Sequence, residues 1–336
     1  MLSKLTVIAA VFATSLLTSS AFACSRILWN TDQANVVART MDLYMSDKAR
    51  IAVFPRGMSH GGPSGMPNML SWKSKYASVG TTALDLAVSD RLNEKGLNAN
   101  LLYLHDTKYE KRDSRPGLTN AAWAQYVLDN FVSVDEAVEA MKQLQIVSIV
   151  VEGREWPLHP SIADAKGDSA IFELVNGKMT VNRGPDTLVM TNEPAFSVQQ
   201  KNLLRYKLFG GKLSMPGDID PKSRFVRASS YLKTLPKPAS LREAIAGAYS
   251  VIRNVAVPFG AHDTSGGDSS DTWPTLWASL ADLSNKVYFF QSTKSANLFW
   301  VDLSKLNSAE GAPVVDADAY DPNLSGDISD KLKPSH

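Results

Sequence analysis

The 336-residue sequence contains one cysteine, Cys24, and therefore no pair of cysteines from which an internal disulfide could form. It also carries little net charge, because 35 lysines and arginines face 34 aspartates and glutamates, for a formal charge of +1. This balance gives no reason to expect a nucleic acid or an anionic membrane as a partner. After residue 23 no apolar run approaches the roughly 18 residues that span a bilayer, so we expect a soluble mature protein with no membrane partner.

Histidine is scarce, and its positions do not suggest a metal centre. The spacing typical of metal ligands is absent from the five histidines, which are His60, His105, His159, His262 and His336. We therefore expect no metal ion and no cofactor, and any chemistry must be carried by other residue types.

The first 23 residues have the three parts of a secretory signal peptide. Lys4 provides the basic start, residues 5–17 form an apolar stretch, and Ala21 and Ala23 give the A-x-A pattern after which signal peptidase cuts. Removal of residues 1–23 would leave 336 − 23 = 313 residues, enough for one large domain. We expect a single domain over 24–336 and a bacterial protein that is periplasmic or secreted.

Cleavage at this point would make Cys24 the first residue of the mature protein. A free α-amino group, with a pKa near neutrality, could then act as the base for the thiol of the same residue. Two other interpretations compete. Cys24 could be the lipidated residue of a lipoprotein, although such processing prefers a Leu-like residue where Ala21 stands, or it could be an inert buried thiol. An unpaired cysteine in an oxidising compartment favours a reactive role.

Hydrophobic periodicity predicts strands at both ends of the chain and helices between them. We expect strands at 25–29, 36–39, 72–79, 96–104, 147–151, 169–175, 178–182, 287–291 and 298–303, and helices at 119–130, 134–144 and 241–254. Residues 55–68 are rich in Gly and Pro and predict a loop. The tail from Asp316 is expected to be frayed or bound at the surface. Strands and helices in separate groups favour an α+β fold with antiparallel sheets.

Four polar residues could assist a thiol nucleophile that carries its own amine. Asp42 could hold and orient the amine, and the positive charge of Arg39 or Arg224 could favour the thiolate. Asn192 has the neutral amide that could donate to a developing oxyanion. Each residue taken alone is more typical of a surface charge or a turn.

A series of short segments follows Cys24 in a fixed order along the chain. They are ARTMD at 38–42, NEKGL at 93–97, PLH at 157–159, MTNEP at 190–194, MPGD at 215–218, SRF at 223–225, YFF at 288–290 and FWV at 299–301. In order and spacing these segments resemble the choloylglycine hydrolase and penicillin V acylase family of N-terminal nucleophile hydrolases. The resemblance covers most of the mature chain.

The resemblance implies a four-layer αββα sandwich with two antiparallel sheets, and a tetrameric assembly. It implies hydrolysis of the C–N bond of a linear acyl amide, a small-molecule substrate, through a thioester. The implied catalytic residues are Cys24 as nucleophile and base, Arg39 beside the thiol, Asp42 beside the amine, Asn192 at the oxyanion, and Arg224 in the surrounding charge network. Because this mechanism needs no histidine, we interpret His159 as structural.

One position departs from the pattern of the bile-salt-cleaving members, which carry an asparagine in the strand after Glu-Lys-Gly-Leu. Leu102 or Tyr103 stands there, and an aromatic residue is what some penicillin V acylases have. We therefore expect penicillin V or a related acyl amide as substrate, acyl-homoserine lactones included, with conjugated bile salts as the alternative. Tyr103, Trp29 and Trp156 are candidate substrate contacts, and each could equally be core packing. A hypothesis of another class is a non-catalytic, lipidated periplasmic binding protein.

Overall fold

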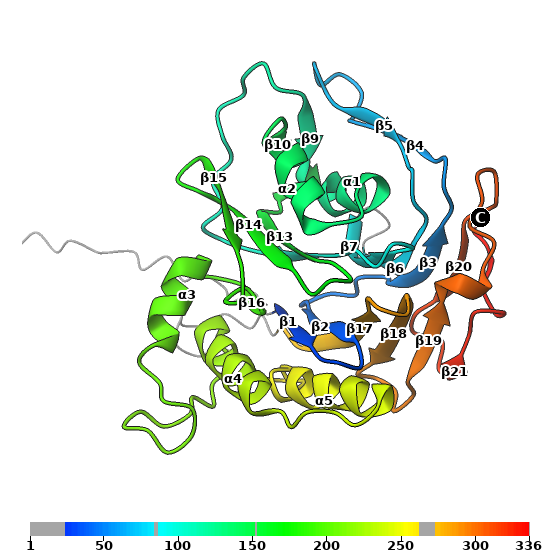
Figure 1. Cartoon of the computed structure of the whole chain (residues 1–336). Coiled ribbons are helices and arrows are strands. Elements are labelled where there is room, and N and C mark those ends of the chain that lie inside the picture. The colour runs from blue at the N-terminus through cyan, green and yellow to red at the C-terminus, as the bar shows by residue number, and fades with distance from the viewer. Residues whose placement is uncertain (1–23, 84–86, 152, 262–272, 336) are drawn as a thin grey trace, which may run out of the picture.

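The computed structural model describes residues 24–83, 87–151, 153–261 and 273–335. The expected signal peptide at 1–23, and also His262 and His336, lie outside these residues. Two large sheets lie face to face in the middle of the molecule, and helices cover the outer face of each (Figure 1).

The first large sheet has seven strands and contains the predicted nucleophile. Neighbouring strands are antiparallel except for the last pair, which is parallel. In order across the sheet the strands are β16 (Val189–Thr191), β1 (Cys24–Asn30), β2 (Asn35–Asp42), β17 (Thr275–Asp282), β18 (Val287–Ser292), β19 (Phe299–Asp302) and β21 (Gly326–Asp327).

The second large sheet has nine strands and is antiparallel throughout. In order they are β15 (Lys178–Arg183), β14 (Ser169–Val175), β13 (Leu158–Ala163), β8 (Asn98–Tyr103), β7 (Ala87–Asn93), β6 (Ser78–Ala83), β3 (Arg50–Phe54), β20 (Val315–Asp318) and β22 (Lys333–Pro334). Three two-stranded pairs complete the strands, namely β4 (Ser59–Gly61) with β5 (Ser71–Lys73), β9 (Gly117–Thr119) with β10 (Gln145–Val147), and β11 (Val150–Val151) with β12 (Arg154–Glu155).

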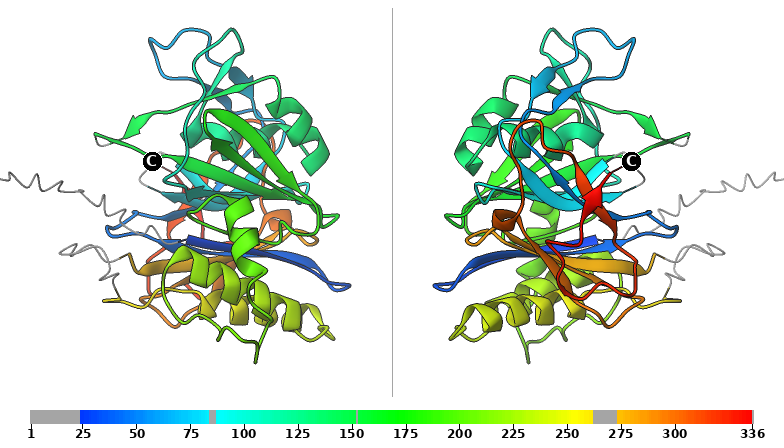
Figure 2. Two further views of the ribbon diagram at one scale, coloured as in Figure 1. Left: turned by 90° about the vertical axis from the view of Figure 1, so that its left-hand side faces the viewer. Right: turned by 90° about the vertical axis from the view of Figure 1, so that its right-hand side faces the viewer.

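The helices divide between the two outer faces, which gives four layers (Figures 1 and 2). The α-helices are α1 (Trp123–Asn130), α2 (Val134–Met141), α3 (Phe196–Leu203), α4 (Pro221–Thr234) and α5 (Leu241–Asn254), and two short 3-10 helices are η1 (Asn120–Ala122) and η2 (Leu303–Lys305). Helices α1 and α2 contact the nine-stranded sheet, whereas α4 and α5 contact the seven-stranded sheet, with α3 beside α4. The αββα sandwich implied by the resemblance is confirmed. Along the described ranges no helix is both long and apolar enough to cross a bilayer.

The alternation of side chains along the strands produces two hydrophobic cores. One core fills the space between the sheets and beneath α4 and α5, and it contains Cys24. The other lies between the nine-stranded sheet and helices α1 and α2, around Trp123 and Phe172. Strand β17 is buried at every residue because it lies in the centre of the first sheet, with a layer on each side. The two cores fix the sheet that carries the site from both faces.

Local signals place several helix starts where the sequence predicts them. The Ser133 side chain accepts from the backbone N–H of Glu136 at the start of α2, and helix α5 has the predicted bounds. Helix α4 was not predicted, although Asp220 caps it and Pro221 occupies its first turn. Most of it is buried, and the buried residues include two arginines and two serines, so its sequence lacks the continuous apolar stripe that marks a surface helix.

Several expectations about the chain are wrong. The single strand expected at 72–79 is two strands, because β5 belongs to a separate hairpin and β6 to the nine-stranded sheet. The strand expected at 147–151 is likewise divided between β10 and β11, which pair with different strands, and the loop expected at 55–68 contains β4. The tail from Asp316 is not frayed. It adds strands to both large sheets, and Ala319 and Ile328 in it are fully or almost fully buried, because the tail supplies apolar side chains to the inter-sheet core.

Gly80 of β6 marks a close approach to β7 that admits no side chain. A Cβ atom there would lie 2.2 Å from the carbonyl oxygen of Asp90 and 2.5 Å from the Cα of Arg91. We expect Gly80→Ala to destabilise the fold by about 1–3 kcal/mol, the usual cost of overpacking, and to lower the melting temperature. Gly217→Ala is the matched control, because a Cβ there meets open space. Equal melting temperatures for the two variants would show that the two strands can separate without cost.

Candidate active site

Cys24 is the first residue of β1, between β16 and β2, and only 6% of its surface is exposed. The register opposes Cys24 to Met41, so Cys24 shares one face of the sheet with Met41 and Arg39. That face points to the nine-stranded sheet. Thr40 and Asp42 occupy the other face, which points to the helices. The site therefore has a thiol side between the sheets and a carboxylate side beneath α4.

Arg39 brings a positive charge to the thiol from within the sheet. Its Nη2 lies 3.7 Å from the Sγ of Cys24. Its Nη1 donates to two carbonyls of the opposite sheet, Ser89 at 2.6 Å and Leu101 at 3.2 Å, and its guanidinium stacks on Trp277 at 5.1 Å. These bonds hold the cation in place across the gap between the sheets, so its position does not depend on the thiol.

Asn192 holds the backbone nitrogen of Cys24. Its Oδ1 accepts a short hydrogen bond from that nitrogen, and its Nδ2 donates to the carbonyl of Tyr103 at 2.7 Å. The two bonds fix the amide plane. Sequence reasoning gave the task of holding the amine to Asp42. In the structure the nitrogen donates instead to Asn192, which directly follows β16, the strand paired with β1.

Arg224 of α4 binds the other side of the same residue. Its Nη1 donates to the carbonyl oxygen of Cys24 at 2.7 Å and to the Oγ of Ser25 at 2.8 Å, and its Nη2 lies 3.3 Å from Asn192 Oδ1. Arg227, one turn further along α4, bonds instead to the carbonyls of Pro216 and Asp218. The structure therefore brings Arg224 to the site and leaves Arg227 outside it.

Asp42 lies on the helix side, where its carboxylate is buried with a partner of opposite charge. Its Oδ2 is 3.9 Å from Arg224 Nη1. Thr275 of β17 donates to its Oδ1 at 2.5 Å, and Thr40 donates to its Oδ2 at 3.3 Å. Neither threonine was assigned a role from the sequence, although Thr40 lies in the ARTMD segment. The pairing of Thr275 with Asp42 across β2 and β17 joins residues 233 positions apart, and no local pattern announces it.

Burial and charge have opposite effects on the pKa of the Cys24 thiol and on that of the Asp42 carboxyl. Burial raises the pKa of the Cys24 thiol, Arg39 lowers it, Asp42 raises it, and Arg224 lowers it to a smaller extent. Burial also raises the pKa of Asp42 to about 7, against the opposite effects of Arg224 and the Thr275 hydrogen bond. Of the groups that favour the thiolate, Arg39 therefore has the largest effect on the pKa of the thiol, and it contacts the sulfur directly.

The structure separates the three aromatic residues proposed as substrate contacts. Tyr103 ends β8, and its backbone carbonyl binds Asn192. Trp156 is close to it in the fold, since the adjacent Pro157 accepts a hydrogen bond from the backbone of Leu104. Trp29 is not brought to the site. It lies at the far end of β1, on the helix-facing side, where it packs so closely that a Cβ on Gly247 of α5 would meet its ring at 2.6 Å.

Comparisons with known proteins agree with this geometry. A model of linear amide C–N hydrolases of the choloylglycine hydrolase family matches residues 24–318. The penicillin V acylase of Pectobacterium atrosepticum is 37% identical, with 93% of this chain and 90% of that protein covered. A bile salt hydrolase/transferase of Clostridium perfringens is 28% identical, over 82% and 91%. The solved structure of a penicillin V acylase from Agrobacterium tumefaciens superposes with a TM-score of 0.84 at 38% identity, over 93% and 98% of the two chains.

The fold and these matches define the class of protein as an enzyme, a hydrolase that acts on linear amide C–N bonds. Within this class, the chain belongs to the choloylglycine hydrolase family. The family resemblance seen in the sequence is confirmed.

The opposing effects on the thiol predict opposite shifts on mutation. Cys24 is the only cysteine, so alkylation by iodoacetamide reports its thiolate alone. We expect Arg39→Met to raise the pH midpoint of alkylation, because it removes the main positive charge, and Asp42→Asn to lower it, because it removes a negative one. Arg227→Met is the control and should leave the midpoint in place. Shifts of the same sign in both site variants would contradict the charge assignment.

Proposed function

We propose that this hydrolase is an exported N-terminal-cysteine amidohydrolase of the penicillin V acylase type, which cleaves acyl amides through a thioester on Cys24. The observation that carries the proposal is the environment of one residue. The thiol of Cys24 lies beside a fixed cation, while side chains of Asn192 and Arg224 hold its backbone nitrogen and oxygen. Fixed positions for both the backbone nitrogen and the thiol suit a mechanism in which the nitrogen is the base and the thiol is the nucleophile.

In the proposed reaction, removal of residues 1–23 converts the nitrogen of Cys24 into an α-amino group. The amine takes the thiol proton, and the sulfur attacks the substrate carbonyl carbon to form a tetrahedral oxyanion. The resulting ammonium protonates the departing amine as the C–N bond breaks, which leaves a thioester on Cys24. The amine then deprotonates a water molecule, and the hydroxide attacks the thioester and releases the acid and the free thiol.

The surrounding residues have distinct parts in this scheme. Arg39 stabilises the thiolate. Asn192 orients the amine through its Oδ1, and the second hydrogen on its Nδ2 donates to the oxyanion, since an amide nitrogen has two donors and Tyr103 takes one. Asp42 acts on the amine through electrostatics and through Arg224, with which it is paired. The backbone can supply a second oxyanion donor.

Export and processing rest on the sequence pattern at residues 1–23 and on the family match, which begins at Cys24. We propose a periplasmic or secreted location and a tetrameric assembly of the single domain at 24–336. The mass and amino-terminal sequence of the mature protein test the proposed processing at Cys24 directly. A free Cys24 supports the amidohydrolase, whereas a diacylglyceryl adduct would support the lipidated binding protein.

The position after Glu-Lys-Gly-Leu favours penicillin V over conjugated bile salts. The residues there are Leu102, which is buried in the core, and Tyr103, and neither residue type has a side-chain amide. The nearby Asn100 is engaged elsewhere, because its Nδ2 donates to Asp90. The higher identity to penicillin V acylases agrees with this choice. A panel of penicillin V, a long-chain acyl-homoserine lactone and glycocholate tests it, and faster turnover of glycocholate than of penicillin V would contradict it.

Cys24→Ser should abolish turnover of the panel substrates and leave the melting temperature close to that of the wild type, because a hydroxyl is a far poorer nucleophile than a thiolate at neutral pH. A protein with one residue retained before Cys24 should also be inactive, because its nitrogen is then an amide and not a base. Substantial turnover by the serine variant would mean that another residue attacks the carbonyl. Full activity of the extended protein would remove the amine from the mechanism.

Asp42→Asn should reduce kcat by roughly ten- to a thousand-fold, the scale of general acid–base contributions, with little change in KM. Because the pKa of Asp42 is about 7, the share of its ionised form rises with pH through neutrality. The part of the rate that depends on this ionisation should therefore increase through pH 7 in the wild type and disappear in the variant. An unchanged kcat with a raised KM would place Asp42 in substrate binding instead.

A further inference from the structure

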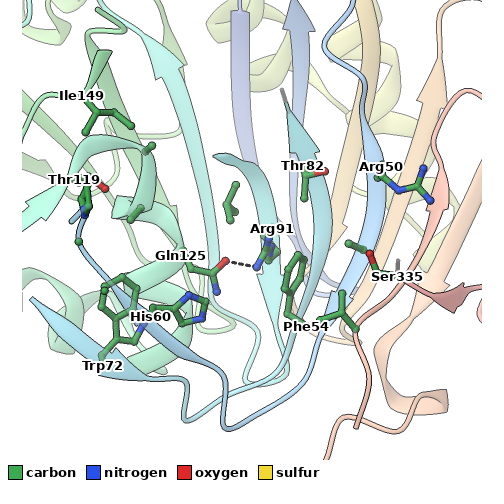
Figure 3. Close-up of a pocket in the computed structure, with 18 of the residues that line it drawn as sticks. Arg50, Phe54, His60, Trp72, Thr82, Arg91, Thr119, Gln125, Ile149 and Ser335 are labelled. Carbon is green, nitrogen blue, oxygen red and sulfur yellow. Dashed lines mark hydrogen bonds between the residues drawn. The ribbon is translucent and has the colours of Figure 1, made fainter. Parts of the chain in front are cut away.

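A cleft lies on the outer face of the nine-stranded sheet, away from Cys24. Its volume is about 940 Å³, within the size range of small-molecule sites. The hairpin β4–β5, strands β3, β6 and β7, the segment before α1 and the end of the chain surround it (Figure 3). On β7, Val88 and Arg91 face the cleft, whereas Leu92 faces the core that contains Cys24. The sheet itself therefore separates the two sites.

The cleft contains a buried arginine whose donors are only partly used. Arg91 is 1% exposed, and its Nη1 donates to Gln125 Oε1 and Ser78 Oγ. Its Nε and Nη2 donate to no residue that the structure describes. The guanidinium lies over the ring of Phe54, with 3.6 Å between its central carbon and the ring centroid, so its Nε and Nη2 are free for a further acceptor (Figure 3).

The other charges of the cleft are paired among themselves. Arg50 makes two hydrogen bonds to the carboxylate of Asp316, at 2.5 and 2.8 Å. Asp129, which is not among the lining residues, accepts from Trp72 Nε1 at 2.7 Å and from Gln125, and it lies 3.3 Å from His60 Nε2. Gln125 thus stands between this carboxylate and the guanidinium of Arg91. Burial lowers the pKa of Arg91 to about 9, so it still carries its charge at neutral pH.

Aromatic and aliphatic groups form the rest of the lining. The rings of His60 and Trp72 are stacked, with centroids 5.1 Å apart. Phe54 and Val88 also line the cleft, and Gln125 lies between the stacked pair and Arg91 (Figure 3). A buried, partly unused cation next to aromatic rings is suited to a ligand that has one negative group and a flat apolar body.

We propose that this cleft is a second ligand site, which binds a small monocarboxylate with an aromatic or apolar body. The carboxylate accepts from Arg91, and the body lies against Phe54, Trp72 and His60. The site requires no chemistry at Cys24, and it exists whether or not the proposed amide hydrolysis is correct.

The test uses the full chain with Cys24 carboxamidomethylated, so that the site around the thiol is blocked, and follows 4-fluorophenylacetate by fluorine NMR. We expect saturable binding with a Kd of about 1 mM or tighter, as the size of the probe allows. The neutral isostere 4-fluorophenylacetamide should bind at least about ten-fold more weakly, because it lacks the charge that Arg91 would bind.

Two variants and their matched controls locate the site. Arg91→Met should weaken binding at least about ten-fold, whereas Arg253→Met, which removes an arginine that also bonds a glutamine and stacks on a tyrosine, should not. Thr82→Phe fills the cleft from β6 and should abolish binding, whereas Thr180→Phe on the distant strand β15 should leave it unchanged.

Each outcome decides the proposal. Equal affinities for the carboxylate and the amide, or equal binding by the wild type and Thr82→Phe, would overturn it. Binding that appears only when Cys24 is unmodified would place the probe at the thiol instead. If Arg91→Met does not fold, the isostere and the Thr82→Phe variant, checked by thermal melting, still settle the question.

Discussion

The site depends on the ion pair between Arg224 and Asp42, which is buried between α4 and the seven-stranded sheet. Two charges removed from water are tolerated only when each has further partners. Arg224 has the backbone of Cys24 and the hydroxyl of Ser25, and Asp42 has two threonines. These bonds join β1, β2, β17 and α4 at one point. Helix α4 and the seven-stranded sheet therefore cannot shift past one another without disturbing the first residue of β1.

The sequence predicts local structure well where one face of an element is exposed. Helix α5 has the expected bounds, because its alternation of polar and apolar residues is clear. The hairpin of β14 and β15 has the expected position for another reason, since β14 is buried on both faces: Asn176-Gly177, a pair typical of a tight turn, separates the two strands. Strand β17 was missed because it is buried on both faces, and helix α4 was missed because arginines and serines are among its buried residues, so neither shows such an alternation. The four-layer arrangement followed from the family resemblance alone, since periodicity does not define how two sheets stack.

The same difference applies to the site. The catalytic residues named from the sequence, Cys24 and four others, form one connected group in the structure. They could be named because they lie in segments whose order along the chain resembles that of the family. Thr275 was missed because its contact with Asp42 exists only in the assembled sheet. Trp29 was included for its aromatic character. Strand alternation from Cys24 would have placed it on the opposite face, against α5.

Asn192 and Arg224 hydrogen-bond to the backbone nitrogen and carbonyl of residue 24, whereas Arg39 contacts its side chain. Backbone atoms are common to all amino acids, so these hydrogen bonds do not depend on which side chain residue 24 carries. Placement and reactivity are thus separate properties of this position. The neighbouring residues fix the position of the backbone, and the side chain of residue 24 determines the chemistry. A chain with another small residue at position 24 would keep the same geometry and differ only in the chemistry it can perform.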